Sequence, residues 1–456
     1  MAKRFVNIDR STPIILPQDM RDWLPQDHIA RFVIEAVDSS DLTLASVNKN
    51  GSGDCQYPPG MMLSMLIYAY CTGRFSSRSI ESATYSDVAL RFITADTHPD
   101  HDTICSFRRN NGPLISSVFI SVLVLAKELK FLHVGTVSID GSKIEANASK
   151  HKAVSFERAQ EKIDHLQVEV TELLERAEKA DSTPLADGLS IPKEIKRRED
   201  RIAQLLKARE NLKARAKAKV EAELMAYEED LRKRKAEAEA GDFRGGPFSP
   251  MPETEPNPGD QYNFTDPESR IMKQGGATHF EQSYNAQAAV DADGSMLVIG
   301  THVTDACNDK EQLVPTLGSI SSEIGVPQAV LVDSGFYSEK AVLEAEGAGV
   351  TVYASVGKQR KHRSVADLGA HQEPAPLLEG ASVKERMMHR LKTAEGKALY
   401  KLRKETVEPV FGIIKETMGF RRFSLRGLVK VNLEWVLVTL AYNVRRLFSL
   451  KTRHCA

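Results

Sequence analysis

Two charged segments between residues 156 and 216 carry apolar residues at spacings of three, four and seven. This spacing is typical of helices that pair along a coiled-coil seam. Pro184, Gly188 and Pro192 separate the segments, which predicts an antiparallel helical hairpin. The helical pattern fades by Ala240, and a Pro- and Gly-rich stretch with linker composition follows to Asn263. The hairpin carries no catalytic pattern, and it could be a spacer, a dimerisation arm or a DNA clamp.

Outside this insertion, short strand patterns alternate with helical ones. Strands are predicted at residues 133–144, 284–290, 296–303, 329–332 and 350–354, and helices at 310–324, at 338–346 and from Lys384 onward. Residues 291–294 have the composition of a hairpin turn. This order predicts a mixed α+β (α/β) chain, with a ribonuclease H-like mixed sheet flanked by helices and interrupted after its first strand.

The expected domains follow from these patterns. Residues 1–133 form a mostly helical domain that includes a helix starting near Pro58 and another from Ser79 towards Phe92. Its short helices and basic turns fit DNA binding, and a plain helical packing domain fits almost as well. Residues 134–152 and 269–450 form the catalytic domain, and residues 153–268 form the hairpin insertion with its linker.

Composition narrows the class of protein. At 456 residues the chain exceeds what one hydrophobic core usually supports. Five scattered cysteines, no apparent secretory signal and no run of about 18 apolar residues favour a soluble, cytoplasmic protein without a membrane span. From Lys384 onward the sequence has 17 Lys and Arg residues but only 6 Asp and Glu residues. Such a basic segment favours a polyanionic partner, although it could also be a solvated basic surface.

Three acids from distant positions form the candidate site. Asp140 and Asp333 each follow an apolar strand pattern, and Glu408 lies among cations on a helical segment. Carboxylates near the strand ends of a mixed sheet are a general location for reactive groups. Two Mg²⁺ ions held by three convergent carboxylates can activate an attacking oxygen and stabilise a leaving oxygen at a phosphodiester. This convergence requires the first and fourth strands to be neighbours.

Each acid also has a structural alternative. Asp140 and Asp333 could cap turns, and Glu408 could form a surface pair with Lys404. Several other acids rank below the three: Asp291 and Asp293 as turn residues, Asp305 and Asp309 at a helix N-terminus, and Glu145 and Glu405 beside the candidate ligands.

The motifs around these acids resemble those of the DDE transposases of bacterial insertion sequences, in the group with a Tyr-Arg-Glu-Lys signature. The resemblance covers most of the chain. It rests on residues 57–81 and 99–108 in the helical region, Asp140-Gly-Ser-Lys-Ile-Glu-Ala-Asn147, Tyr284-Asn-Ala-Gln287, Asp333-Ser-Gly-Phe-Tyr337 and Glu408-Pro-Val-Phe-Gly-Ile-Ile-Lys415.

This resemblance implies that Asp140, Asp333 and Glu408 ligate two Mg²⁺ ions, with Mn²⁺ as a substitute. It also implies that Tyr400, Arg403 and Lys415 contact DNA phosphates. Arg403 departs from the signature, because five residues to Glu408 correspond to about 140° around an ideal helix. Lys404 keeps the one-face register and is therefore expected to replace Arg403 as a phosphate contact.

The resulting hypothesis is a DNA transposase that cuts at the ends of an insertion sequence and transfers the 3′-OH ends into target DNA. Its expected partner is double-stranded DNA, both the terminal inverted repeats and the target. The protein is also expected to form a homodimer and to be associated with the nucleoid. Further contacts to the DNA backbone are expected from Arg421, Arg422 and Arg426. The alternatives are a domesticated metal-dependent nuclease of the same fold and a non-enzymatic, DNA-binding coiled-coil protein.

Overall fold

The computed structural model describes residues 19–48, 55–180, 191–239, 255–274, 279–356, 374–377 and 380–455. Two of the predicted hairpin separators, Pro184 and Gly188, lie outside these residues, as does most of the polar stretch before Lys384. The chain divides into two compact units. Unit 1 comprises Met1–Ala146 with Tyr284–Ala456, and unit 2 comprises Asn147–Ser283.

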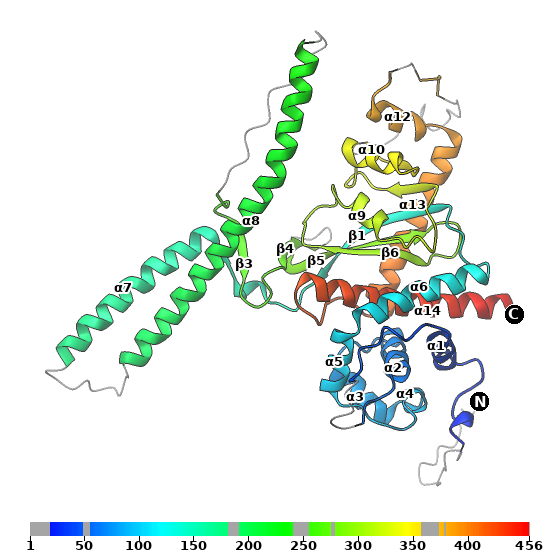
Figure 1. Cartoon of the computed structure of the whole chain (residues 1–456), viewed down its shortest axis with the longest axis horizontal. Helices are drawn as coiled ribbons and strands as arrows, with labels where there is room; N and C mark the ends of the chain where they lie inside the picture. The colour runs from blue at the N-terminus through cyan, green and yellow to red at the C-terminus, as the bar shows by residue number, and fades with distance from the viewer. Residues whose placement is uncertain are drawn as a thin grey trace, which may run out of the picture. The chain divides into compact units, whose positions relative to one another are not determined.

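Unit 1 begins with a helical region, which lies at the bottom of Figure 1. Its α-helices are α1 (Ile29–Asp38), α2 (Pro59–Cys71), α3 (Ser77–Ser86), α4 (Val88–Ile93), α5 (His101–Asn110) and α6 (Gly112–Glu128). The single helix predicted from Ser79 is in fact two, because the Asp87 side chain caps the start of α4. Among the described residues no single helix meets the length and hydropathy needed to cross a membrane; only the bent pair α5–α6 meets them jointly.

A mixed sheet forms the centre of unit 1. Its strands are β1 (Thr136–Glu145), β5 (Phe280–Asp291), β6 (Val298–Thr304), β7 (Ala329–Val332) and β8 (Thr351–Ala354). The order is β5-β1-β7-β8, β6 pairs with β5, and the β1–β7 and β7–β8 pairs are parallel. The first four residues of β5 belong to unit 2. The predicted mixed α+β class is therefore confirmed.

Helices from the C-terminal part of the chain pack on this sheet. They are α9 (Leu313–Gly318), α10 (Glu339–Gly347), α12 (Val383–Arg390), α13 (Ala394–Gly412) and α14 (Leu428–Cys455). Helix α13 packs against β1 and β7, where Leu331 and Tyr353 form a cluster with Leu399 and Leu402. Helix α14 packs on β6 and α6, and Figure 1 shows it between the sheet and the N-terminal helices.

Two predicted helices have different limits in the structure. The helix expected over residues 310–324 is only α9, because Gly318 and a Ser-rich segment end it in turns. The long helical region from Lys384 is also broken. Helix α13 passes into a π-helical turn, Ile413–Thr417, and an irregular segment then leads to α14.

A buried ion pair joins the N-terminal helices to this C-terminal region. Arg108 Nη1 lies 3.9 Å from Glu434 Oε1 and donates to the Tyr70 hydroxyl at 2.8 Å. The other oxygen of Glu434 accepts the backbone N–H groups of Ser424 and Leu425, each at 2.9 Å. Burial raises the pKa of Glu434, which Arg108 opposes. The network therefore connects α2, α5 and α14 with the segment that follows the π-helical turn.

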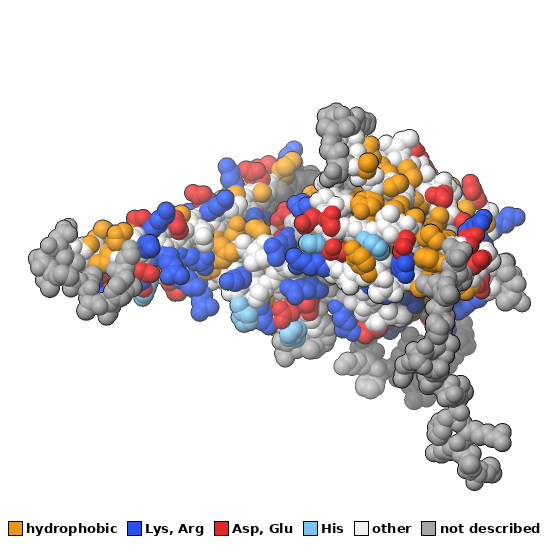
Figure 2. Space-filling view, turned by 90° about the horizontal axis from the view of Figure 1, so that it is seen from below, with side chains coloured by type: hydrophobic (Ala, Val, Ile, Leu, Met, Phe, Trp, Pro, Cys, Tyr) orange, Lys and Arg blue, Asp and Glu red, His pale blue; other side chains and the backbone are white. Residues whose placement is uncertain are grey.

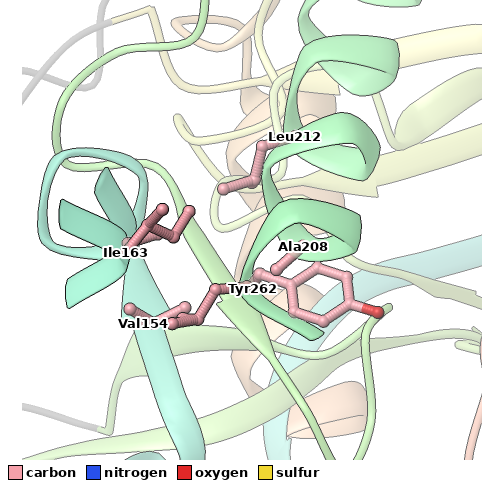
Figure 3. Close-up of a cluster of buried hydrophobic side chains, with 7 residues drawn as sticks. Val154, Ile163, Ala208, Leu212 and Tyr262 are labelled. Atoms are coloured by element: carbon pink, nitrogen blue, oxygen red, sulfur yellow. The ribbon is translucent and has the colours of Figure 1, made fainter. Parts of the chain in front are cut away.

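Unit 2 contains the predicted insertion. Its elements are a 3₁₀ turn (Lys150–Lys152), β2 (Ala153–Ser155), α7 (Phe156–Ala180), α8 (Ile191–Glu239), β3 (Gln261–Asn263) and β4 (Arg270–Lys273). Helices α7 and α8 pack together, and the first part of α7 shares a small apolar core with the middle of α8, Val154 and Tyr262. Figure 3 shows Ile163 of α7 facing Leu212 of α8 within this core.

Two predictions for this region were wrong in detail. Pro192 is the second residue of α8 rather than part of the separator, since Pro is tolerated in the first turn of a helix. The stretch assigned to a linker includes β3, which pairs with β2 in antiparallel fashion, and β4 pairs with the start of β5. These strands are too short for a clear alternation in the sequence.

Candidate active site

Asp140 and Asp333 lie at matching positions of two neighbouring strands. β1 and β7 pair in parallel, with Thr136 opposite Ala329 and Ser138 opposite Leu331. The same offset sets Asp140 opposite Asp333, which directly follows β7. Side chains at matching positions point to the same face of a sheet. On this face Ser138 Oγ donates to the carbonyl oxygen of Arg403 in α13. The predicted adjacency of the first and fourth strands is confirmed.

Arg403 connects this strand pair to Glu408. Its side chain is 10 % exposed, and its Nη1 lies 3.8 Å from Asp140 Oδ2 while its Nη2 lies 3.5 Å from Glu408 Oε1. One guanidinium thus forms ion pairs with two of the three predicted acids. The Tyr400 ring lies beneath it, with 6.0 Å between the ring centroid and the guanidinium carbon. Asp140 and Glu408 therefore share Arg403 where α13 crosses β1 and β7, and Asp333 lies beside Asp140 at the end of β7.

The surroundings of Asp140 favour its protonated form. Burial is the main reason that the pKa of Asp140 rises to about 6, and the Gly141 N–H, which donates to Oδ1 at 2.8 Å, opposes the rise. The negative charges of Asp333 and Asp309 add to it, and Arg403 works against them. A nearby cation would stabilise the ionised form of a carboxylate in these surroundings.

The structural alternatives have different outcomes for the three acids. Strand β1 continues through Gly141 to Glu145, so Asp140 does not cap a turn. Asp333 does, because its Oδ1 accepts the Gly335 N–H at 2.7 Å. Glu408 pairs with Arg403 rather than with the predicted alternative partner Lys404.

The three predicted acids lie in one part of the structure, but they are not close enough together to hold a metal ion as a group. Among the described residues, no group of three or more His, Cys, Asp or Glu side chains is close enough to hold a metal ion. The position of Arg403 supplies a physical reason, since its guanidinium lies between Asp140 and Glu408 and balances both charges.

Arg403, rather than Lys404, lies beside the candidate acids in the structure. Arg403 is buried in the site, whereas Lys404 is exposed. Although five residues separate Arg403 from Glu408, the long Arg side chain spans the angle between them. Tyr400 is half-buried near Asp333, and burial raises the pKa of its hydroxyl. The prediction from an ideal helix considered only backbone positions and left out the length of the Arg403 side chain.

The remaining predicted cations have different surroundings. Lys415 lies in the π-helical turn, and its ammonium group donates to the Lys143 carbonyl oxygen at 2.9 Å. Burial lowers the pKa of Lys415. Arg421 is exposed and pairs with Glu416, and Arg422 donates to the Ala146 carbonyl oxygen. Arg426 is exposed.

On the face shown in Figure 2, Lys and Arg side chains lie in small groups beside Asp and Glu side chains, with apolar patches between them.

Three polar residues beside the site were given no functional role from the sequence: Asp309, which was ranked below the three acids, and Asn285 and Gln287. The Asp309 carboxylate accepts the side-chain amides of Asn285 and Gln287, both of which are buried, and these groups lie against Gly141. Asp309 had been predicted at a helix N-terminus, although α9 starts four residues later. The polar pair Asn285 and Gln287 within an apolar strand pattern was the available signal. The turn position predicted for Asp293 is confirmed, whereas Asp291 is the last residue of β5 and accepts the Ser295 N–H.

Two family models match this chain. A transposase DDE domain matches residues 376–448, and a transposase domain (DUF772) matches residues 18–110. The first segment includes α13 with Arg403 and Glu408, and the second includes α1 to α5. Asp140 and Asp333 lie between the two segments. No curated protein and no solved structure matches the chain.

Proposed function

Since the chain belongs to the DDE transposases of insertion sequences, we propose that it cuts DNA at the ends of its element and joins the freed ends to target DNA. Water attacks the phosphodiester at each end and releases a 3′-OH, and this hydroxyl then attacks the target strand. The observation that carries the proposal is that Asp140 and Glu408 share the Arg403 guanidinium while Asp333 lies beside Asp140 at the end of β7.

Asp140, Asp333 and Glu408 are the proposed metal ligands. The donor set fits Mg²⁺, which prefers a few carboxylates together with water and phosphate oxygens, and Mn²⁺ can substitute. When bound, two such ions would activate the attacking oxygen and stabilise the leaving oxygen. The raised pKa of Asp140 supports a cation there, because burial and neighbouring acids are both offset by positive charge.

Arg403 has two proposed partners. In the free protein it balances the charges of Asp140 and Glu408. On DNA binding it moves to a phosphate oxygen, for which its planar fork is well suited, and leaves both carboxylates to the metal. Tyr400, Lys404, Lys415, Arg421, Arg422 and Arg426 are the further proposed phosphate contacts.

The proposed architecture follows the order of elements. Residues 134–152 and 269–450 form a ribonuclease H-like catalytic domain, residues 153–268 form a coiled-coil insertion, and residues 1–133 form the helical domain that binds terminal repeats. A homodimer that pairs two ends is proposed because both ends must be cut and joined together.

Strand transfer with a pre-cut element end tests this function. The duplex carries the inverted repeat that flanks the coding region and ends in a 3′-OH, and a supercoiled plasmid serves as target. Joined product that depends on Mg²⁺ is expected. A protein that cleaves the uncut end but never joins the pre-cut one is a nuclease. Binding without cleavage on any end sequence would leave only a DNA-binding role.

A further inference from the structure

Three polar side chains joined by hydrogen bonds lie next to β1, the strand that carries Asp140. Asp309, in the segment between β6 and α9, accepts two side-chain amides with its Oδ1 atom. Asn285 Nδ2 and Gln287 Nε2 both donate to it at 2.7 Å. Both amides come from β5, the strand next to β1. We call these three residues the Asp309 layer.

The Asp309 layer is in tight contact with Gly141. A Cβ atom on Gly141 would lie 2.4 Å from Gln287 Nε2 and 2.5 Å from Asp309 Oδ1. Only a residue without a side chain therefore fits between the layer and the peptide that follows Asp140. That peptide also fixes the acid, because the Gly141 N–H donates to Asp140 Oδ1 at 2.8 Å. A path of direct contacts thus leads from Asp309 through Gly141 to the Asp140 carboxylate.

The orientation of the layer is set at some energetic cost. Asn285 and Gln287 are fully buried, and within the described structure Asn285 Oδ1 and Gln287 Oε1 accept no hydrogen bond. An unsatisfied buried oxygen is unfavourable, because it has lost its hydrogen bonds to water. Charge-assisted hydrogen bonds to the Asp309 carboxylate offset part of this cost. Lys143, two residues after Gly141, places its ammonium nitrogen 3.7 Å from Asp309 Oδ2 and so connects β1 to the layer a second time.

We propose that Asp309 is a positioning residue: through the amides of Asn285 and Gln287 it fixes the Asp140–Gly141 peptide, and so aims the Asp140 carboxylate at the bound metal. This role rests on the proposed function. Groups that orient metal ligands from outside typically change metal affinity by about 10–100-fold when they are removed. The negative charge of Asp309 also raises the pKa of Asp140, in addition to burial and Asp333.

Mn²⁺ affinity of the full-length protein tests the role without depending on turnover. Electron paramagnetic resonance measures free Mn²⁺ during titration, with and without element-end DNA. Asp309→Ala is expected to weaken binding by about 10–100-fold. It should lower kcat for end cleavage by a similar factor and leave KM for DNA nearly unchanged. Asp309→Asn keeps an oxygen for both amides, so it should recover most of the affinity lost in the alanine variant.

Two further variants control for unrelated effects. Glu311→Ala removes an exposed carboxylate from the same segment and should bind Mn²⁺ as the wild type does. Should Asp309→Ala fail to fold by circular dichroism, Gln287→Met replaces it, because this swap conserves volume and removes only the hydrogen bond.

The outcomes separate the role of Asp309 from the function on which it rests. Wild-type Mn²⁺ affinity in a folded Asp309→Ala or Gln287→Met protein would overturn the positioning role alone. A loss that Asp309→Asn does not reduce would overturn it as well, since the hydrogen bonds would then be irrelevant. Failure of the wild-type protein to bind Mn²⁺ even with element-end DNA would overturn both proposals.

Discussion

Asp140 and Asp333 stand opposite each other on two parallel strands, although the whole of unit 2 separates them in the chain. Strand register rather than sequence distance brings them together. An insertion of any length after β1 leaves their spacing unchanged, because the β1–β7 pairing sets it. Glu408 joins them from α13 through its ion pair with Arg403.

Substitution of any of the three acids should abolish chemistry without loss of DNA binding. Asp140→Asn, Asp333→Asn and Glu408→Gln are each expected to lower end cleavage by at least about 1,000-fold, since each removes a metal ligand. Gel-shift affinity for the element end should stay within about two-fold, because phosphate contacts come from cations. Glu405→Gln, an exposed acid on the same helix, is the matched control and should cleave normally. A variant that still cuts would exclude its residue from the site.

Arg403 and Lys404 should differ strongly in importance. Arg403→Gln is expected to lower cleavage by about 100-fold, the usual loss when one group that stabilises a reacting phosphate is removed. Lys404→Gln should stay within about three-fold, because an exposed Lys contributes one screened charge. Single-turnover cleavage rates at saturating DNA measure both. Equal losses would favour the sequence-based expectation that Lys404 replaces Arg403.

Asp140 should make the metal-free protein less stable at neutral pH. Its folded pKa, about 6, lies above the ordinary value of 3.8. The stabilisation from the protonated acid is therefore present below pH 4 and is lost as the pH rises through 6. Asp140→Asn, which stays neutral, should be more stable than the wild type by about 3 kcal/mol at pH 7.5. Urea unfolding with a chelator, from pH 4.5 to 7.5, should show this gain shrinking as the pH falls. A gain independent of pH would contradict the raised pKa.

The buried pair between Arg108 and Glu434 should be necessary for stability. Glu434→Ala leaves the Arg108 charge buried without its partner and should cost about 3–5 kcal/mol in the free energy of unfolding. Glu416→Ala removes the partner of Arg421 on the exposed surface and should cost less than about 1 kcal/mol. Thermal and urea unfolding of both variants measure the difference. Similar small losses would mean that water or another group compensates for Glu434.

Several features were predictable because local chemistry determines them. Strand patterning was enough to recognise the apolar segments of β1 and β7 and the acid that follows each of them. Heptad spacing predicted the helices α7 and α8. The short β3 and β4 strands were not predictable, because each depends on hydrogen bonds with another strand. The helix boundary at Asp87 depends on a local cap, which the strand and helix patterns did not reveal.

The sequence by itself determined which side chains could hold metal and which segments could be strands or helices, since residue type and periodicity carry that information. Only the tertiary structure decided that Arg403, and not Lys404, lies between Asp140 and Glu408, and that Asp309 supports Gly141. Both relationships join residues remote in the chain. They depend on strand register and on the reach of individual side chains, which no linear spacing records.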